Sequence, residues 1–95
     1  MIGKHVMVRT ENAGVHFGVL THHHLQEVTL KNARRVWYWS GAASLSQLSV
    51  DGTSNPDDCK FPCPVEEIML EGMIEMIPLT DKARESLEAV PIWNL

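Results

Sequence analysis

The sequence predicts a mostly-β fold: a small, strongly bent antiparallel barrel with one or two short helices, the clearer of them C-terminal. Short apolar runs alternate with polar residues at every second position, and Gly, Asn or Pro separates most of these runs. The length of 95 residues, with 44% hydrophobic and 21% charged residues, suits one globular domain. We therefore expect a single small barrel over residues 1–95, with an inserted helix and loop at about 41–64.

The first two strands are predicted to form a β-hairpin. Residues 5–10 and 15–21 both alternate, and residues 11–14 between them are turn formers. Gly18 interrupts the second run, which predicts a sharp bend or the close approach of another backbone.

Two more strands are predicted to follow this hairpin. The three histidines at 22–24 are expected to form a polar connection, and residues 27–31 alternate again, with Val28 and Leu30 inward. Residues 34–39 are β-branched and aromatic, which favours a fourth strand.

The inserted segment is predicted to hold a short helix over residues 42–48 and a loop over 51–64. The loop is rich in proline and small polar residues, and a loop of that length is usually functional or mobile. We expect it to act as a lid over a binding site.

The last part of the chain is predicted to return to the sheet and then end in a helix. Residues 65–70 and 73–79 have strand patterns that meet at a Glu-Gly turn. Thr80 is a good N-cap for a helix over 81–88, which Pro91 would end.

Two blocks of the chain resemble the Sm-like family of small SH3-like barrels. They are Val6-x-Val8 … Gly14 … Gly18-x-Leu20 … Val28-x-Leu30-x-x-Ala33 and Ile68-x-Leu70-Glu71-Gly72-x-Ile74-x-Met76-Ile77. The resemblance implies a ring or smaller homo-oligomer that forms by pairing of strand edges. The chain departs from the family in lacking its N-terminal helix and in carrying Glu71 where a basic residue contributes to RNA binding.

A second set of motifs is similar to a family of small bacteriophage and prophage proteins of unknown function. It consists of Val8-Arg9-Thr10-x-x-Ala13-Gly14-Val15-His16-x-Gly18-x-Leu20 and Asn32-Ala33-Arg34-Arg35-Val36-Trp37-Tyr38-Trp39-x-Gly41-Ala42. This resemblance spans about residues 6–52. It implies a phage origin and a cytoplasmic location in the bacterial host cell.

Residues 34–39 form the first candidate site. Alternate residues of an extended segment share a face, which places Arg35, Trp37 and Trp39 together and Arg34 on the other side. A guanidinium beside indole rings supplies charge for a phosphate and a flat surface for a base, as nucleotide ligands require. The alternative is structural: the tryptophans fill the core and the arginines extend along its edge.

The turn after the first strand forms the second candidate site. A tight turn at Gly14 can direct N–H groups at an anion, and Thr10 and Asn12 add hydrogen-bonding groups. Arg9 adds charge, and His16 offers a further ligand contact. The alternative is that the turn merely reverses the chain and that His16 is solvated or locally bonded.

Metal binding and catalysis have little support in the sequence. Adjacent residues of an extended chain point in opposite directions, so the histidines at 22–24 cannot easily share one ion. Cys59 and Cys63 form a CxxxC pattern, a weak zinc signal, and we expect two reduced thiols. The chain has no phosphate-binding glycine loop, HExxH or nucleophile motif. We therefore predict no enzyme activity, no cofactor and no metal site.

Charge and hydropathy narrow the classes of partner. The net charge is −4, yet residues 1–40 hold five basic residues against two acidic ones, and residues 41–95 hold three against ten. This balance disfavours duplex DNA and permits a small anion in a local basic pocket. No apolar run approaches the ~20 residues of a membrane span, so a membrane partner is not expected.

The leading hypothesis is a non-enzymatic phage protein that binds and sequesters a nucleotide-type ligand, such as a nucleotide messenger of bacterial immunity. Arg34 or Arg35 would neutralise phosphate, and Trp37 or Trp39 would stack on a base, with the ligand bound between subunits of a homo-oligomer. The alternatives are a protein-interaction module that inhibits a host protein through the same patch, an Sm-like RNA-binding ring, and a virion component.

Overall fold

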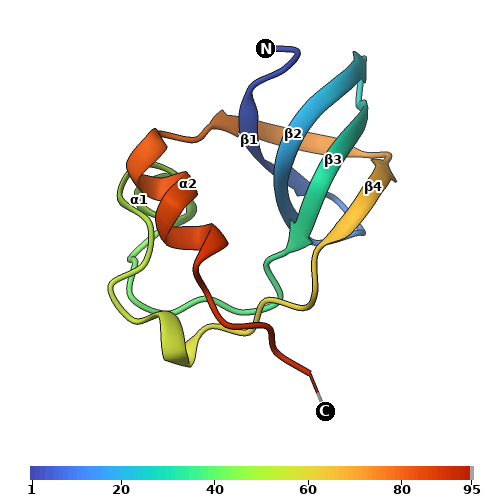
Figure 1. The fold of residues 1–95 in the computed structure, drawn as a ribbon. Coiled ribbons are helices and arrows are strands. Elements are labelled where there is room, and N and C mark those ends of the chain that lie inside the picture. Colours follow the sequence, from blue (N-terminus) through green and yellow to red (C-terminus); the bar gives the residue numbers. More distant parts are fainter. Residues whose placement is uncertain (95) are drawn as a thin grey trace.

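The computed structural model describes residues 1–94 as a curved antiparallel sheet with two short helices packed beside it (Figure 1). The strands are β1 (His5–Thr10), β2 (Val15–His24), β3 (Glu27–Arg35), β4 (Val65–Leu70) and β5 (Met73–Pro78). The helices are α1 (Leu45–Asp51) and α2 (Asp81–Glu88), with a 3-10 turn at Pro56–Asp58 between β3 and β4. The predicted fold class, mostly β with a C-terminal helix, is confirmed.

The order of the strands explains the strong curvature of the sheet. The order is β4-β3-β2-β1-β5, so four strands form a meander and the fifth returns to pair with the first. Only Glu71 and Gly72 separate β4 from β5, although these strands lie at opposite edges. The sheet must therefore curl until its edges approach each other at this corner. Within residues 1–94 no ladder joins β4 to β5, so the predicted barrel is an open, strongly bent sheet.

Both faces of this sheet are buried, as the first strand illustrates. Val6 and Val8 point into one apolar cluster, and Met7 between them points into another. The inner cluster fills the curl of the sheet and consists of Val6, Val8, Leu20, Val28, Leu30, Ala33 and Leu70. The outer cluster lies between the sheet and the helical part and consists of Met7, Phe17, Val36, Leu48, Cys59, Phe61, Leu87 and Val90.

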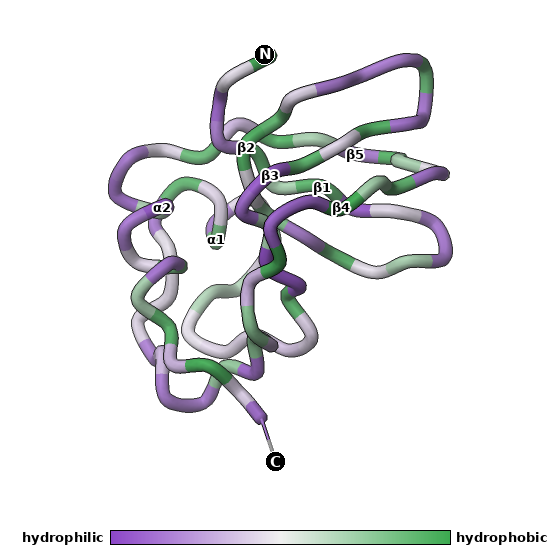
Figure 2. Tube along the Cα trace, turned by 45° about the vertical axis from the view of Figure 1, so that its right-hand side comes forward, coloured by the Kyte–Doolittle hydropathy of each residue, from purple (hydrophilic) through white to green (hydrophobic). Residues whose placement is uncertain are grey.

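The hairpin of β2 and β3 is longer and more continuous than predicted. His22–His24 belong to β2 and extend it into a largely hydrophilic hairpin that projects away from the helices (Figure 2). Asn32 does not end the third strand. It takes a left-handed conformation (φ 50°) within the strand, where the pairing with β2 shifts register between Phe17 and Val19. Gly18 confirms the predicted close approach: a Cβ there would lie 2.8 Å from the Lys31 carbonyl oxygen and 3.1 Å from the Ala33 Cα.

The predicted separate strand over residues 34–39 is wrong. β3 ends at Arg35, and Val36 N–H donates to the Val15 carbonyl oxygen, at the first residue of β2. Beyond this point β2 offers no further residue with which to pair. The following residues leave the sheet and make only one bridge, between Tyr38 and Lys60.

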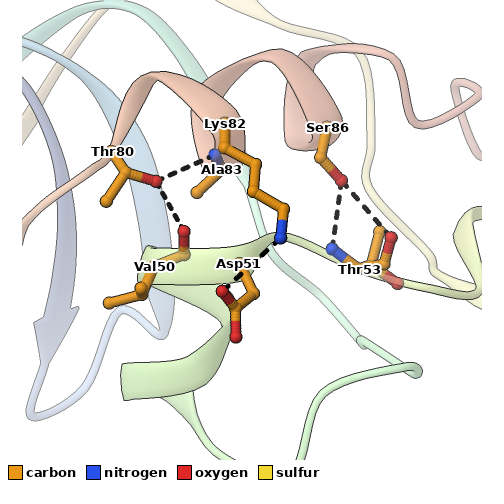
Figure 3. A network of polar contacts seen from close by, with 7 residues as sticks. All are labelled: Val50, Asp51, Thr53, Thr80, Lys82, Ala83 and Ser86. Carbon is orange, nitrogen blue, oxygen red and sulfur yellow. Dashed lines mark hydrogen bonds and ion pairs between the residues drawn. The ribbon is translucent and has the colours of Figure 1, made fainter.

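The two helices are fastened to each other by polar contacts (Figure 3). Thr80, the predicted N-cap of α2, accepts from Ala83 N–H (3.0 Å) and donates to the carbonyl oxygen of Val50 in α1 (2.6 Å). Just after α1, Thr53 N–H donates to Ser86 Oγ on α2 (3.0 Å). The predicted helix over 42–48 begins later, because Ser44 is the N-cap of α1 and its Oγ accepts from Gln47 N–H.

The loop over residues 51–64 is part of the folded body and does not form a lid. Cys59 and Phe61 are buried in the outer cluster, and the Phe61 ring lies edge-on to Phe17, with ring centroids 5.9 Å apart. Ser40 N–H donates to the Cys59 thiol (3.5 Å), which ties the loop to the segment after β3. The length of the loop suggested mobility, but its apolar residues anchor it.

Candidate functional site

One pocket gathers four of the eight predicted site residues. It has a volume of about 330 Å³ and lies where the β1–β2 turn meets the segment after β3. We call it the Arg35 pocket, and its walls are Asn12, Ala13, Gly14, Val15, Arg35, Val36, Trp37 and Trp39. The predicted alternation of Arg35, Trp37 and Trp39 thus places all three on one pocket, although β3 ends at Arg35.

Arg35 brings an uncompensated positive charge to this pocket. Its Nη1 donates to the Ala13 carbonyl oxygen (2.9 Å), which uses one of the five guanidinium N–H groups. The ion pairs among residues 1–94 are Arg9–Glu75, Lys82–Asp51 and Arg84–Glu88, so Arg35 has no acidic partner there. Because none of the pocket walls is acidic, the site favours an anion.

The two tryptophans of the pocket differ in their environment. Trp39 is half-buried against the outer cluster, and its Nε1 donates to the Ala42 carbonyl oxygen (3.3 Å). Trp37 is 64% exposed and stacks on Trp93, with centroids 6.3 Å apart and ring planes inclined by 9°. Trp39 is therefore a fixed wall, and Trp37 is an accessible aromatic surface.

The β1–β2 turn contributes hydrogen-bond donors. Thr10 is buried and holds the turn from within: its Oγ1 accepts from Ala13 N–H (2.9 Å) and donates to the Gly14 carbonyl oxygen (2.8 Å). Gly14 has a positive φ of 79°, which lets the backbone turn tightly under the guanidinium. No hydrogen bond among residues 1–94 uses the N–H of Gly14 or the side chain of Asn12. Thr10 thus positions the turn, while Gly14 and Asn12 offer donors.

His16 supports the pocket from behind and does not line it. Its side chain is 1% exposed, and Nε2 donates to the Ala13 carbonyl oxygen (2.8 Å), the group that also accepts from Arg35. Burial lowers the pKa of His16, the bond to Ala13 opposes this shift, and the nearby Arg35 charge adds to it. The predicted ligand contact is thus a neutral positioning group.

Arg34 is a structural residue, contrary to its predicted role. It is 5% exposed, and its five N–H groups donate to the backbone carbonyl oxygens of Phe61, Pro62, Leu87, Val90 and Pro91. Burial lowers the pKa of this guanidinium. Arg34 joins β3 to the end of α2 and has no N–H left for a phosphate.

Arg9 and the metal-type residues lie outside the Arg35 pocket. Arg9 is exposed on β1 and pairs with Glu75 of β5 (3.4 Å). Cys59 and Cys63 are both free thiols, one buried and one exposed. Residues 1–94 contain no group of three or more His, Cys, Asp or Glu side chains arranged to hold a metal ion.

Two residues beside the pocket, Lys60 and Trp93, were not predicted from the sequence as site residues. Lys60 is bridged to Tyr38, and Trp93 N–H donates to the Phe61 carbonyl oxygen (2.9 Å). Both are far in the chain from residues 37 and 38, and no local pattern signals that Lys60 pairs with Tyr38 or that Trp93 stacks on Trp37.

Neither helix of residues 1–94 has the length and apolar composition needed to span a bilayer.

Comparison with known proteins identifies a family but no activity. No curated protein sequence matches the chain. Residues 3–87 match the family described as "Domain of unknown function (DUF6948)". The matched range includes every strand, α1, all but the last residue of α2 and the whole Arg35 pocket. The chain therefore belongs to the DUF6948 family, a family of unknown function.

Proposed function

We propose that this protein binds and sequesters a nucleotide-type ligand in the Arg35 pocket without converting it chemically. The observation that carries the proposal is an arginine without an acidic partner among residues 1–94, beside an exposed tryptophan in a pocket whose walls contain no carboxylate. A volume of about 330 Å³ lies at the lower end of the range for small-molecule sites.

Each wall of the pocket has a role in this proposal. The free N–H groups of Arg35 bind a phosphate, and the Gly14 N–H and Asn12 side chain donate further hydrogen bonds. The exposed ring of Trp37 stacks on the base, and Trp39 closes the apolar end. The shared Ala13 carbonyl fixes the guanidinium before the ligand arrives, which lowers the entropic cost of binding.

A phage protein acting in the bacterial cytoplasm would use such a pocket to remove signalling nucleotides of host immunity. The outer sides of β4 and β5 have no partner strand within residues 1–94. This supports the further proposal of a homo-oligomer formed by strand pairing, because an open edge can pair with another strand.

A thermal-shift screen against cyclic dinucleotides, ADP-ribose derivatives and mononucleotides tests the proposal. We expect a stabilising ligand whose effect disappears in Arg35→Ala, while the melting temperature of the ligand-free variant stays close to that of the wild type. Arg9→Ala is the matched control, since Arg9 is exposed outside the pocket. If no nucleotide shifts the melting temperature, or if both variants respond equally, the pocket is not a nucleotide site.

A second candidate function is a protein-interaction module. The observation that favours it is the exposed aromatic surface of Trp37, Tyr38 and Trp93. Aromatic residues are enriched among the residues that dominate binding energy at protein interfaces. A host protein that binds the wild type and fails to bind Trp37→Ala, without any nucleotide effect, would favour this function.

A further inference from the structure

A second cationic and aromatic cluster lies next to the Arg35 pocket. The segments around residues 38, 60 and 92 run side by side at the end of the molecule below the sheet (Figure 1). Tyr38 and Lys60 form a bridge with paired backbone hydrogen bonds (3.2 and 2.8 Å), and Phe61 bridges to Ile92. These contacts bring together one cationic side chain, Lys60, and two aromatic ones, Tyr38 and Trp93.

Lys60 is a second cation without an acidic partner among residues 1–94. Its Nζ lies 6.0 Å from the centroid of the Tyr38 ring and 5.7 Å from that of the Trp93 ring. Both rings are about half exposed to solvent. The cluster therefore offers an accessible ammonium held over flat aromatic surfaces.

Trp37 connects this cluster to the Arg35 pocket. It lines the pocket and also stacks on Trp93, with the two indole planes only 9° from parallel. A continuous strip thus runs from Arg35 through Trp37 and Trp93 to Lys60. It has one cation at each end and a stacked pair of indoles between them. A single nucleotide has one base and needs one aromatic surface, whereas this strip has two.

We infer that the ligand is of the dinucleotide class, with two bases and two phosphate groups that engage both ends of this strip. The inference rests on the proposed function, because it assigns the first base and phosphate to Trp37 and Arg35. The second base packs on the exposed parts of the Tyr38 and Trp93 rings, and Lys60, which lies over both rings, binds the second phosphate. Since stacking of one base on an aromatic side chain strengthens binding substantially, the second half tightens binding at least about tenfold.

Isothermal titration calorimetry with matched probes tests this inference on the full chain. The probes are AMP and GMP, ADP and GDP, and the linear dinucleotides pApA and pGpG. ADP and GDP carry two phosphates on one base, so they separate the effect of the second base from that of charge. We expect pApA to bind about ten times more tightly than ADP, or pGpG about ten times more tightly than GDP.

Substitutions locate the second half of the site. Lys60→Gln should reduce dinucleotide affinity toward that of the mononucleotide and leave mononucleotide affinity unchanged, and Trp93→Ala should also reduce dinucleotide affinity. Lys82→Gln, at an exposed lysine of α2, is the matched control. The melting temperatures of the variants show whether each one folds. If Trp93→Ala does not fold, the dinucleotide affinity of Lys60→Gln alone tests the inference.

The outcomes separate the two proposals. Two results would overturn the dinucleotide inference and leave the Arg35 pocket as a nucleotide site. The first is that dinucleotides bind no more tightly than mononucleotides. The second is that Lys60→Gln leaves dinucleotide affinity unchanged. Absence of binding by every probe, together with a negative thermal-shift screen, would overturn both.

Discussion

Arg34 and Arg35 are adjacent in the chain and have opposite roles. Arg34 donates all its N–H groups to backbone carbonyl oxygens inside the protein, and Arg35 donates one and keeps the others for the pocket. The alternation of an extended segment predicted that they face opposite sides. It could not predict which side is interior, because that depends on the end of α2, which is more than 50 residues away in the chain.

Arg34→Ala should destabilise the fold strongly, because several buried carbonyl oxygens would lose a charged donor. We expect a loss of about 3 kcal/mol, which corresponds to a fall in melting temperature of roughly 12 °C or more for a domain of this size. Calorimetry or circular dichroism measures the change. Arg84→Ala, which breaks a pair with Glu88 on the surface of α2, is the control and should cost less than about 1 kcal/mol. Equal effects of the two substitutions would refute the structural role of Arg34.

His16 should make the stability of the protein depend on pH. Its pKa in the fold is below the ordinary value of 6.5, so the unfolded chain takes up a proton at a pH where the folded protein does not. Stability from this group is full above pH 6.5 and declines as the pH falls toward the folded pKa, by at most about 1.4 kcal/mol per pH unit for one proton.

Urea unfolding between pH 7.5 and pH 5 tests this dependence. His16→Gln keeps a side-chain N–H for the Ala13 carbonyl and has no titrating ring, so its stability should decline less over this range. His22→Gln, at the exposed end of β2, is the control and should follow the wild type. A wild-type decline that His16→Gln leaves unchanged would show that another group is responsible.

At the scale of elements, the sequence predicts what local patterns determine. The first hairpin, the two last strands and the Thr80-capped helix follow from alternation and capping, and the structure contains all of them. The end of β3 and the anchoring of the 51–64 loop were not predictable, because each depends on a distant partner. β3 ends where β2 begins at Val15, and the loop is held by the burial of Phe61 against Phe17.

Gly52 caps α1 at its contact with α2, and a side chain at this position should destabilise the fold. A Cβ at this position, where φ is 76°, would clash with both the Cβ and the Oγ of Ser86. Gly3→Ala is the matched control, since Gly3 also has a positive φ (84°) and has no atom within 4 Å of the added Cβ. Gly52→Ala should therefore lose about 1–3 kcal/mol more stability than Gly3→Ala. Chemical unfolding of both variants measures the difference, and equal losses would mean that the helices do not pack this closely.

At the scale of the whole molecule, the open edges of the sheet predict self-association. Met69 on the edge strand β4 is 74% exposed, and β4 has no partner on its outer side among residues 1–94. Analytical ultracentrifugation should give a mass above the 10.7 kDa of one chain, and Met69→Lys should reduce it. Leu25→Lys, at the equally exposed tip of the β2–β3 hairpin, should leave the mass unchanged. A single species of 10.7 kDa at all concentrations would contradict this expectation.

The proposed function requires that Arg35 and Trp37 hold a nucleotide in one accessible pocket. Its most direct test is to incubate wild-type protein and Arg35→Ala with a nucleotide extract of bacterial cells, to remove unbound material, and to identify by mass spectrometry what denaturation releases. We predict that the wild type releases a compound with a base and at least one phosphate and that Arg35→Ala does not. Release of no nucleotide from the wild type, or of the same nucleotide in equal amount from both proteins, would contradict the claim.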